Sequence, residues 1–132
     1  MTEWGRYANL QAETFVRFQR REQIADGSLV KAVRDAGKGL IEADLGGGLI
    51  KQRVARRGEG KRGGYRVVLA YRRSERAVFL YGFAKSARAN IEDDELEILR
   101  RRGAGLLNAA EEALEFMIAD DELKEVSYDE EG

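Results

Sequence analysis

The spacing of apolar residues in the first third of the chain is typical of helices. Charged residues separate four apolar ones over residues 8–25, and we predict a moderately amphipathic helix there. Its apolar residues are Leu10, Phe15, Phe18 and Ile24. Asp26-Gly27-Ser28 is predicted to be a turn that caps a second helix, whose apolar face runs from Leu29 to Ile41. The glycines at 46–48 then end the helical pattern.

The middle of the chain changes to the pattern of strands. Residues 49–55 are predicted to form a short strand. Residues 65–71 and 77–84 are predicted to form two stronger ones, because they are rich in β-branched and aromatic residues. A glycine-rich loop over residues 57–64 and a tight turn over residues 72–76 connect them. Strands joined by such short connections pair antiparallel. We therefore predict a small antiparallel sheet of three or four strands.

The last third is predicted to form one long helix and an acidic tail. Apolar or small residues recur at three- and four-residue steps from Leu96 to Met117, which places them on one helical face. Asn90 is a candidate N-cap, and Gly103 and Gly105 favour a kink or break. Residues 120–132 form the tail. The predicted fold class is α+β, with two N-terminal helices, the sheet and a C-terminal helix in one domain over residues 1–132.

Composition excludes several kinds of site. The 132 residues include no cysteine and no histidine, which excludes disulfides, thiolate zinc sites and histidine-based acid–base catalysis. No Walker or dinucleotide-binding pattern accompanies the glycines, and we expect no metal and no cofactor. The sequence has no apolar run of about 18 residues and no secretory leader. We therefore expect a cytoplasmic protein without membrane association.

Charge is distributed very unevenly along the chain. Residues 1–50 carry seven basic and seven acidic residues, residues 51–91 carry twelve and two, and residues 92–132 carry four and fifteen. A compact basic block is typical of a protein that binds a polyanion. The acidic last third has two interpretations. It is either a solvated helix and tail, or a shield for the basic block.

The basic residues fall on predicted strands, where side chains alternate between the two faces. Lys51 and Arg53 therefore share a face, and Arg66 lies on one face of the next strand. Phe79, Tyr81 and Phe83 are expected to share a face of the last strand. With helices on one side of the sheet, the other side can gather cations and an aromatic ring, as in a cradle for phosphates and bases. The alternative for Arg66 is an ion pair with Glu75 or Glu59.

Three segments together resemble a known family. They are Asp44–Arg56, Gly60–Val67 and Phe79–Ser86, followed by Asn90-Ile91. In this combination the chain resembles the RelE toxin family, the toxin half of bacterial toxin–antitoxin pairs, and specifically a branch with a glycine-rich loop before the central strand. The resemblance covers roughly residues 40–132. Residues 1–39 match only in their helical pattern.

The resemblance implies an mRNA endonuclease, or mRNA interferase, that works in the ribosomal A site and inhibits translation. Such enzymes need no metal. The ribose 2′-OH attacks the adjacent phosphate, and lysine, arginine and often tyrosine replace histidine. The positions that match the catalytic cations of the family are Lys51, Arg53, Arg66 and Lys85. Arg66 corresponds to the arginine that stabilises the transition state. Lys51 and Arg53 correspond to a basic pair that binds the substrate phosphate and helps to deprotonate the 2′-OH. Further candidate contacts to the RNA are Arg56, Lys61, Arg62, Tyr81 and Arg88.

Two positions depart from the best-studied members of the family. Ser86 stands where they have an arginine, and Glu92 where they have a tyrosine that acts as a base. Two alternatives therefore stay open: a non-nuclease toxin like the ParE group, which inhibits DNA gyrase, and an inert nucleic-acid-binding module. The resemblance also implies a cognate antitoxin, expected to be a small helix-turn-helix DNA-binding protein.

Overall fold

The computed structural model describes residues 8–56, 60–88 and 90–126, and the side chains of these residues except 56 and 60–63. The class is α+β, as predicted, with four helices and six strands in the described part. The order is β1 (Asn9–Ala12), α1 (Glu13–Glu22), α2 (Asp26–Gly37), β2 (Ala43–Gly46), β3 (Leu49–Arg56), β4 (Gly60–Arg72), β5 (Arg76–Ala84), α3 (Asp93–Leu107), α4 (Glu111–Ala119) and β6 (Leu123–Glu125).

All six strands form one mixed sheet with the order β2-β3-β4-β5-β1-β6. The predicted antiparallel meander is present as β3, β4 and β5. The sheet is larger than predicted because three short strands extend it: β2 pairs with β3 at one edge, and β1 and β6 extend the other side. β1 runs parallel to β5, so the prediction of a small, purely antiparallel sheet was wrong.

β1 corrects the prediction of a helix over residues 8–25. The helix begins only at Glu13, and Asn9–Ala12 is a strand whose four residues are all buried. Its partners are β5 and β6, with Leu10 opposite Val78 on one side and Glu125 on the other. Both partners lie far away along the chain. Local periodicity therefore contains no signal for this strand, and tertiary pairing decides its structure.

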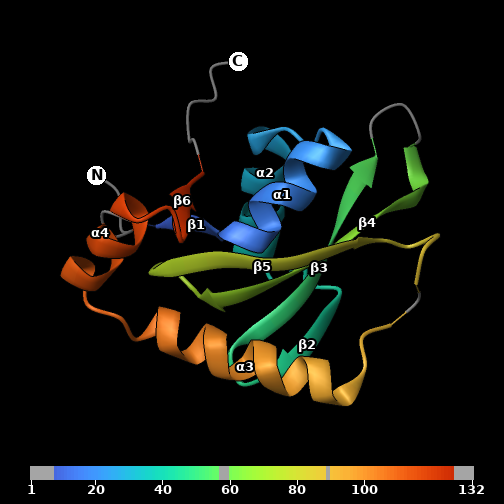
Figure 1. The fold of residues 1–132 in the computed structure, drawn as a ribbon. Helices are drawn as coiled ribbons and strands as arrows, with labels where there is room; N and C mark the ends of the chain where they lie inside the picture. The colour runs from blue at the N-terminus through green and yellow to red at the C-terminus, as the bar shows by residue number, and fades with distance from the viewer. Residues whose placement is uncertain (1–7, 57–59, 89, 127–132) are drawn as a thin grey trace.

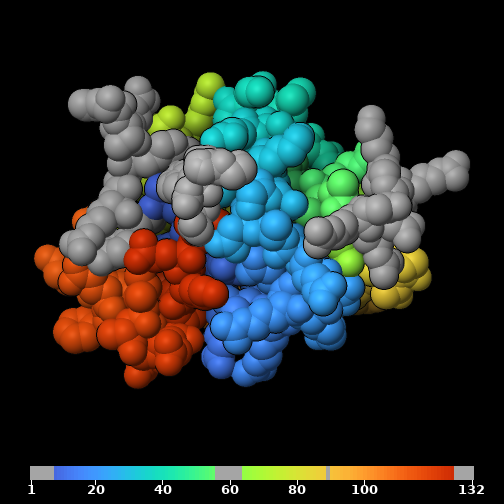
Figure 2. Space-filling view, turned by 90° about the horizontal axis from the view of Figure 1, so that it is seen from above, coloured from blue at the N-terminus to red at the C-terminus, as the bar shows by residue number. Residues whose placement is uncertain are grey.

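Helices cover both faces of the sheet (Figure 1). On one face α1 and α2 pack on the sheet through a core that includes Phe15, Leu29, Val67 and Phe79. On the other face α3 and α4 cover a second core that includes Leu49, Leu80 and Leu114. Figure 2 looks onto the first face, where α4 and β6 (orange to red) lie beside α1 (blue).

The predicted long C-terminal helix is two helices. α3 ends at Leu107 and α4 begins at Glu111, so the break falls after Gly103 and Gly105 rather than at them. Glu92 is the N-cap of α3 in place of Asn90, and its backbone N–H donates to Glu95 Oε1 at 2.9 Å.

Arginines from the β4–β5 hairpin cap the C-terminus of α3. Arg76 Nη1 donates to the carbonyl oxygens of Leu106 (2.8 Å) and Ala109 (2.9 Å), and Arg72 Nη1 donates to that of Leu107 (3.0 Å). The carbonyls of Leu106 and Leu107 belong to the last turn of α3, where they lack a partner within the helix and carry the negative end of its dipole. Two residues of the basic block therefore have a structural role.

Gly103 allows α3 to lie close to the sheet. A Cβ at this position would stand 3.0 Å from the Ala70 Cβ and 3.1 Å from Leu49 Cδ2, whereas one at Gly105 would meet nothing within 4 Å. The glycine therefore sits at the contact point between helix and sheet, and its lack of a side chain sets their distance.

Three smaller expectations also need correction. β4 begins at Gly60, so the predicted loop over residues 57–64 is partly strand; residues 57–59 lie outside the described part. A bulge in β5 makes Leu80 an extra residue, because Val68 pairs with Tyr81 and Leu69 with Phe79. Phe79 and Tyr81 therefore point to opposite faces. In the acidic tail, Leu123–Glu125 form β6, and Leu123 and Val126 are buried.

Among the described helices, none has the length and apolar character needed to cross a membrane.

The matched glycines of α3 give a first prediction. Gly105→Ala is expected to stabilise the fold by up to about 1 kcal/mol, because alanine favours the helix and the added methyl meets open space. Gly103→Ala is expected to destabilise it by about 1–2 kcal/mol, because the Ala70 Cβ is fixed by the strand backbone. Urea denaturation of both variants measures the difference. Equal effects of the two substitutions would contradict the close contact.

Candidate nucleic-acid interface

Three of the predicted cations, Lys51, Arg53 and Arg66, lie on the face of the sheet that carries α3. They are near the ends of the strands that α3 does not cover. Arg53 on β3 stands directly opposite Arg66 on β4, and Arg66 stands opposite Phe83 on β5. One row further along, Lys51, Val68 and Tyr81 are opposite one another. Directly opposed residues point to the same side of a sheet. The alternation in the sequence thus predicted a cluster that the register assembles.

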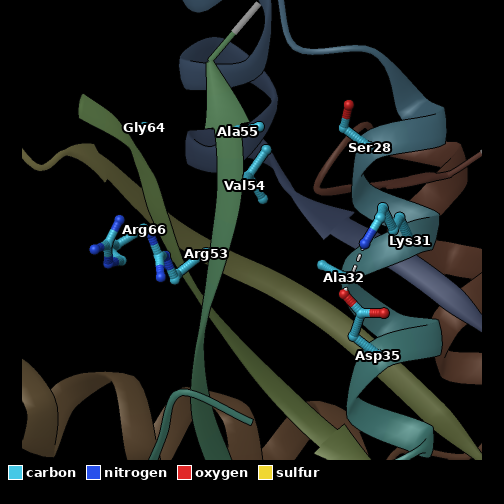
Figure 3. A pocket seen from close by; sticks show the side chains of 9 residues that line it. All are labelled: Ser28, Lys31, Ala32, Asp35, Arg53, Val54, Ala55, Gly64 and Arg66. Atoms are coloured by element: carbon cyan, nitrogen blue, oxygen red, sulfur yellow. Dashed lines mark hydrogen bonds and ion pairs between the residues drawn. The ribbon is translucent and has the colours of Figure 1, made fainter. Parts of the chain in front are cut away.

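A cavity of about 400 Å³ lies at this end of β3. The strands contribute Arg53, Val54, Ala55, Gly64 and Arg66, and α2 contributes Ser28, Lys31, Ala32 and Asp35. Figure 3 shows Arg53 and Arg66 together on one side of β3, and the α2 residues on the other. β2 pairs with β3 only as far as Lys51, so the cavity follows the edge of β3 beyond that point. The contribution of α2 was not predicted from the sequence.

Arg66 forms an ion pair with Glu42, the residue that precedes β2. Glu42 Oε1 lies 3.0 Å from Arg66 Nε, and Nε donates to Oε2 at 3.1 Å. The Arg66 side chain is only 9% exposed and that of Glu42 is 28% exposed. The alternative for Arg66, a pair with Glu75, is wrong: Glu75 contacts Arg72. Glu59 lies outside the described residues. A buried guanidinium needs such a carboxylate, because an unpaired charge there is costly.

Gln52 fixes the segment that carries Glu42. This side chain is buried, and its Nε2 donates to the carbonyl oxygens of Ala32 on α2 and Leu40, both at 3.0 Å. Its Oε1 accepts the backbone N–H of Glu42 at 3.0 Å. Three bonds from one buried amide therefore hold residues 40–42 against α2 and β3.

Arg88 and two aromatic rings form a second cluster on the same face. The Arg88 guanidinium lies 5.9 Å from the ring centre of Tyr81 and 6.0 Å from that of Phe83. Its Nη2 donates to Glu95 Oε1 at 2.6 Å and its Nη1 to the Tyr81 hydroxyl at 2.9 Å. These hydrogen bonds raise the pKa of Arg88, and the bond from Arg88 lowers the pKa of Glu95. Arg88 therefore ties the segment after β5 to the start of α3.

The remaining candidates are placed less closely. Lys85 directly follows β5; its backbone N–H donates to the Gly64 carbonyl at 3.1 Å and its side chain is exposed. Ser86 is exposed near it, and Glu92 caps α3. Arg56, Lys61 and Arg62 lie on β3 and β4, but their side chains are outside the described part.

Sequence reasoning missed four residues that build or support this site. They are Glu42, Gln52, Phe83 and Glu95. Glu42 and Gln52 carry no pattern of their own, because their roles arise from the pairing of segments that precede and follow the glycine turn. Only Phe83 had a signal, its place two residues beyond Tyr81 on the same strand.

A sequence model described as the RelE toxin of the RelE / RelB toxin–antitoxin system matches residues 9–126. The chain belongs to the RelE toxin family. The match includes β1 and α1, where the resemblance had rested on helical pattern alone. A search of curated proteins found no match. Family membership implies an antitoxin as the partner of this toxin.

The Arg88–Glu95 pair gives a pH prediction. Because the folded chain lowers the pKa of Glu95, the pair stabilises the fold above the ordinary carboxyl pKa. This contribution is lost as the pH falls through the lowered value. Glu95→Gln is expected to reduce stability near neutral pH, with the difference from the wild type shrinking as the pH falls through the lowered pKa of Glu95. Urea denaturation across this range measures it.

Glu97→Gln is the matched control on the same helix. Its contacts to Arg100 and Arg101 are longer, at 3.5 and 3.7 Å, and exposed, so its effect is expected to be small. A loss for Glu95→Gln that stays constant with pH would contradict the ion-pair explanation.

Proposed function

We propose that this toxin is a metal-independent endoribonuclease that cleaves mRNA on the ribosome and so inhibits translation. One observation supports it most: Arg53 and Arg66 stand opposite each other and line one cavity at an open strand edge. A cavity with two guanidinium groups suits a phosphodiester, because the planar fork of arginine matches phosphate oxygens. Because the chain belongs to a toxin family, we expect this binding to inhibit a process in the cell.

The reaction is a displacement at phosphorus within the RNA itself. The 2′-oxygen forms a bond to the adjacent phosphorus, the bond to the 5′-oxygen breaks, and a 2′,3′-cyclic phosphate remains. Arg66 stabilises the negative charge of the phosphorane through Nη2, since its Nε donates to Glu42 and its Nη1 donates to the Tyr65 carbonyl at 3.4 Å. Arg53 and Lys51 on the neighbouring strand bind the phosphate and its neighbours along the RNA.

The rings of Tyr81 and Phe83 add surfaces on which RNA bases can stack. Tyr81 and Phe83 lie 5.9 Å apart between ring centres, on the face that carries Arg66. Bases of single-stranded RNA stack on aromatic rings and on guanidinium planes. Arg88, which covers both rings, offers such a plane. We therefore assign Tyr81 and Arg88 to base binding and Lys85 to the phosphate backbone.

The ribosome positions the substrate in this proposal. The cavity is open and the described residues show no deep slot for a nucleotide, so the site alone orients the 2′-OH poorly. An mRNA held in the A site is already ordered, and much of the entropic cost of reaction is met before the toxin binds. The partner that silences the toxin is an antitoxin, which we expect to be a small helix-turn-helix protein.

The test is primer extension on a defined mRNA in a purified translation system. The wild type is expected to cut within codons only when ribosomes are present, and Arg66→Ala to reduce cutting by about 10²-fold or more. Arg73→Ala is the matched control, because Arg73 belongs to the basic block but lies exposed in the β4–β5 turn. It is expected to keep most of the activity. Thermal melting checks that Arg66→Ala still folds.

Intact mRNA in the presence of folded wild-type protein would overturn the proposal. A DNA supercoiling assay then follows, since inhibition of gyrase would identify a ParE-like toxin. If translation and supercoiling both continue, the chain acts as a nucleic-acid-binding module.

A further inference from the structure

We propose that Glu42 is the group that accepts the proton of the attacking 2′-OH. This inference rests on the endoribonuclease proposal and names a residue for one of its steps. A chain without histidine needs another base, and Glu92, at the position of the tyrosine base in other members of the family, caps α3. Glu42 is the carboxylate that the structure brings to Arg66.

The position of Glu42 follows from its contact with Arg66. Both carboxylate oxygens lie within 3.1 Å of Arg66 Nε. Nη1 donates to the Tyr65 carbonyl, which leaves Nη2 for a phosphate. A phosphate bound by Nη2 of this guanidinium is close to the Glu42 carboxylate, and the reacting 2′-OH belongs to the ribose next to that phosphate. Each carboxylate oxygen has a second lone pair for the hydroxyl proton. The Glu42 side chain is 28% exposed, so the hydroxyl can reach it.

The protein holds Glu42 in place before the substrate binds. The buried Gln52 amide accepts its backbone N–H and anchors Leu40 and Ala32. Two buried side chains, Gln52 and Arg66, thus fix the backbone and the carboxylate of one residue from two strands. Support of this kind from surrounding groups is what an acid–base residue requires and a surface ion pair does not.

Other carboxylates of the region are engaged elsewhere. Glu95 accepts bonds from both terminal nitrogens of Arg88 and from the backbone N–H of Glu92. Asp35 accepts from Lys31 at 3.0 Å on the α2 side of the cavity. Of the carboxylates in the described part, Glu42 is the one in contact with Arg66.

The 2′-OH gives its proton to the Glu42 carboxylate as its oxygen bonds to phosphorus. The 5′-oxygen leaves with the electron pair of the broken bond and takes a proton from water. Glu42 then returns its proton to water, so that the enzyme regains its starting state with no net consumption of a co-reactant.

The decisive variant is Glu42→Gln, which keeps an oxygen to accept the Arg66 Nε–H bond but cannot take a proton. In the ribosomal cleavage assay its kcat is expected to fall about 10²–10³-fold. Binding to ribosomes programmed with an mRNA that carries a 2′-O-methyl group at the cleaved nucleotide is expected to change less than threefold. A residue that only positions Arg66 would keep most of its kcat in this variant.

The pH profile of kcat gives an independent readout. The wild-type rate is expected to fall at low pH, and Glu42→Gln is expected to lose this acidic limb. Glu42 pairs with Arg66 from β4, and Lys51 and Arg53 flank Gln52, the β3 residue that binds the Glu42 backbone. On the α2 side, Lys31 and Asp35 line the cavity. An acidic limb that persists in Glu42→Gln belongs to one of these groups or to the RNA, and it would overturn the assignment.

Glu75→Gln is the matched control, because Glu75 also contacts an arginine, Arg72 at 3.9 Å, but lies in the β4–β5 turn. It is expected to cleave like the wild type. Glu42→Asp, which restores a carboxylate, is expected to recover part of the lost kcat. If the wild type and Glu42→Gln cleave equally, the inference about Glu42 fails while the nuclease proposal stands. If the folded wild type does not cleave, both fail.

Discussion

The close approach of α3 to the sheet at Gly103 determines where the binding face can be. The helix lies against Ala70 and Leu49, and its C-terminus is held by Arg72 and Arg76. Under α3 the sheet residues are apolar; beyond it they are Lys51, Arg53 and Arg66. The interface is therefore the part of one sheet face that the helix leaves uncovered. Moving the helix away from the sheet would expose Leu49 and Leu80 and would separate Glu95 on α3 from Arg88.

The cations of the basic block have two different roles, which their contacts in the structure distinguish. Arg72 and Arg76 neutralise the end of a helix, and Arg88 links β5 to α3. Arg53 and Arg66 line the cavity. A count of charges along the sequence cannot make this distinction, because both kinds occur within the same forty residues. The acidic last third supplies Glu95 to Arg88, so part of the opposite charge in that segment holds the face together.

The meander of β3, β4 and β5 was predictable because its signals are local. Residues 65–71 and 77–84 are rich in β-branched and aromatic residues, and a short turn joins them. The strands that carry Arg53 and Arg66 were therefore predicted correctly. What failed depends on distant segments. Asn9–Ala12 becomes a strand only because β5 and β6 flank it, and the bulge at Leu80 turns Tyr81 away from Phe79. Glu42 reaches Arg66 across an intervening strand, which no spacing along the chain encodes.

The strand order also constrains how the chain is made. β1 is near the N-terminus, yet it lies between β5 and β6, and β6 is near the opposite end of the sequence. β1 therefore lacks its partner β5 until the chain has been synthesised through Arg76–Ala84, and it lacks β6 until Leu123–Glu125 follow. Contacts between such distant segments form late in folding. The six-stranded sheet is therefore complete only after Leu123–Glu125 have been added, whereas the strands that carry Arg53 and Arg66 are made earlier.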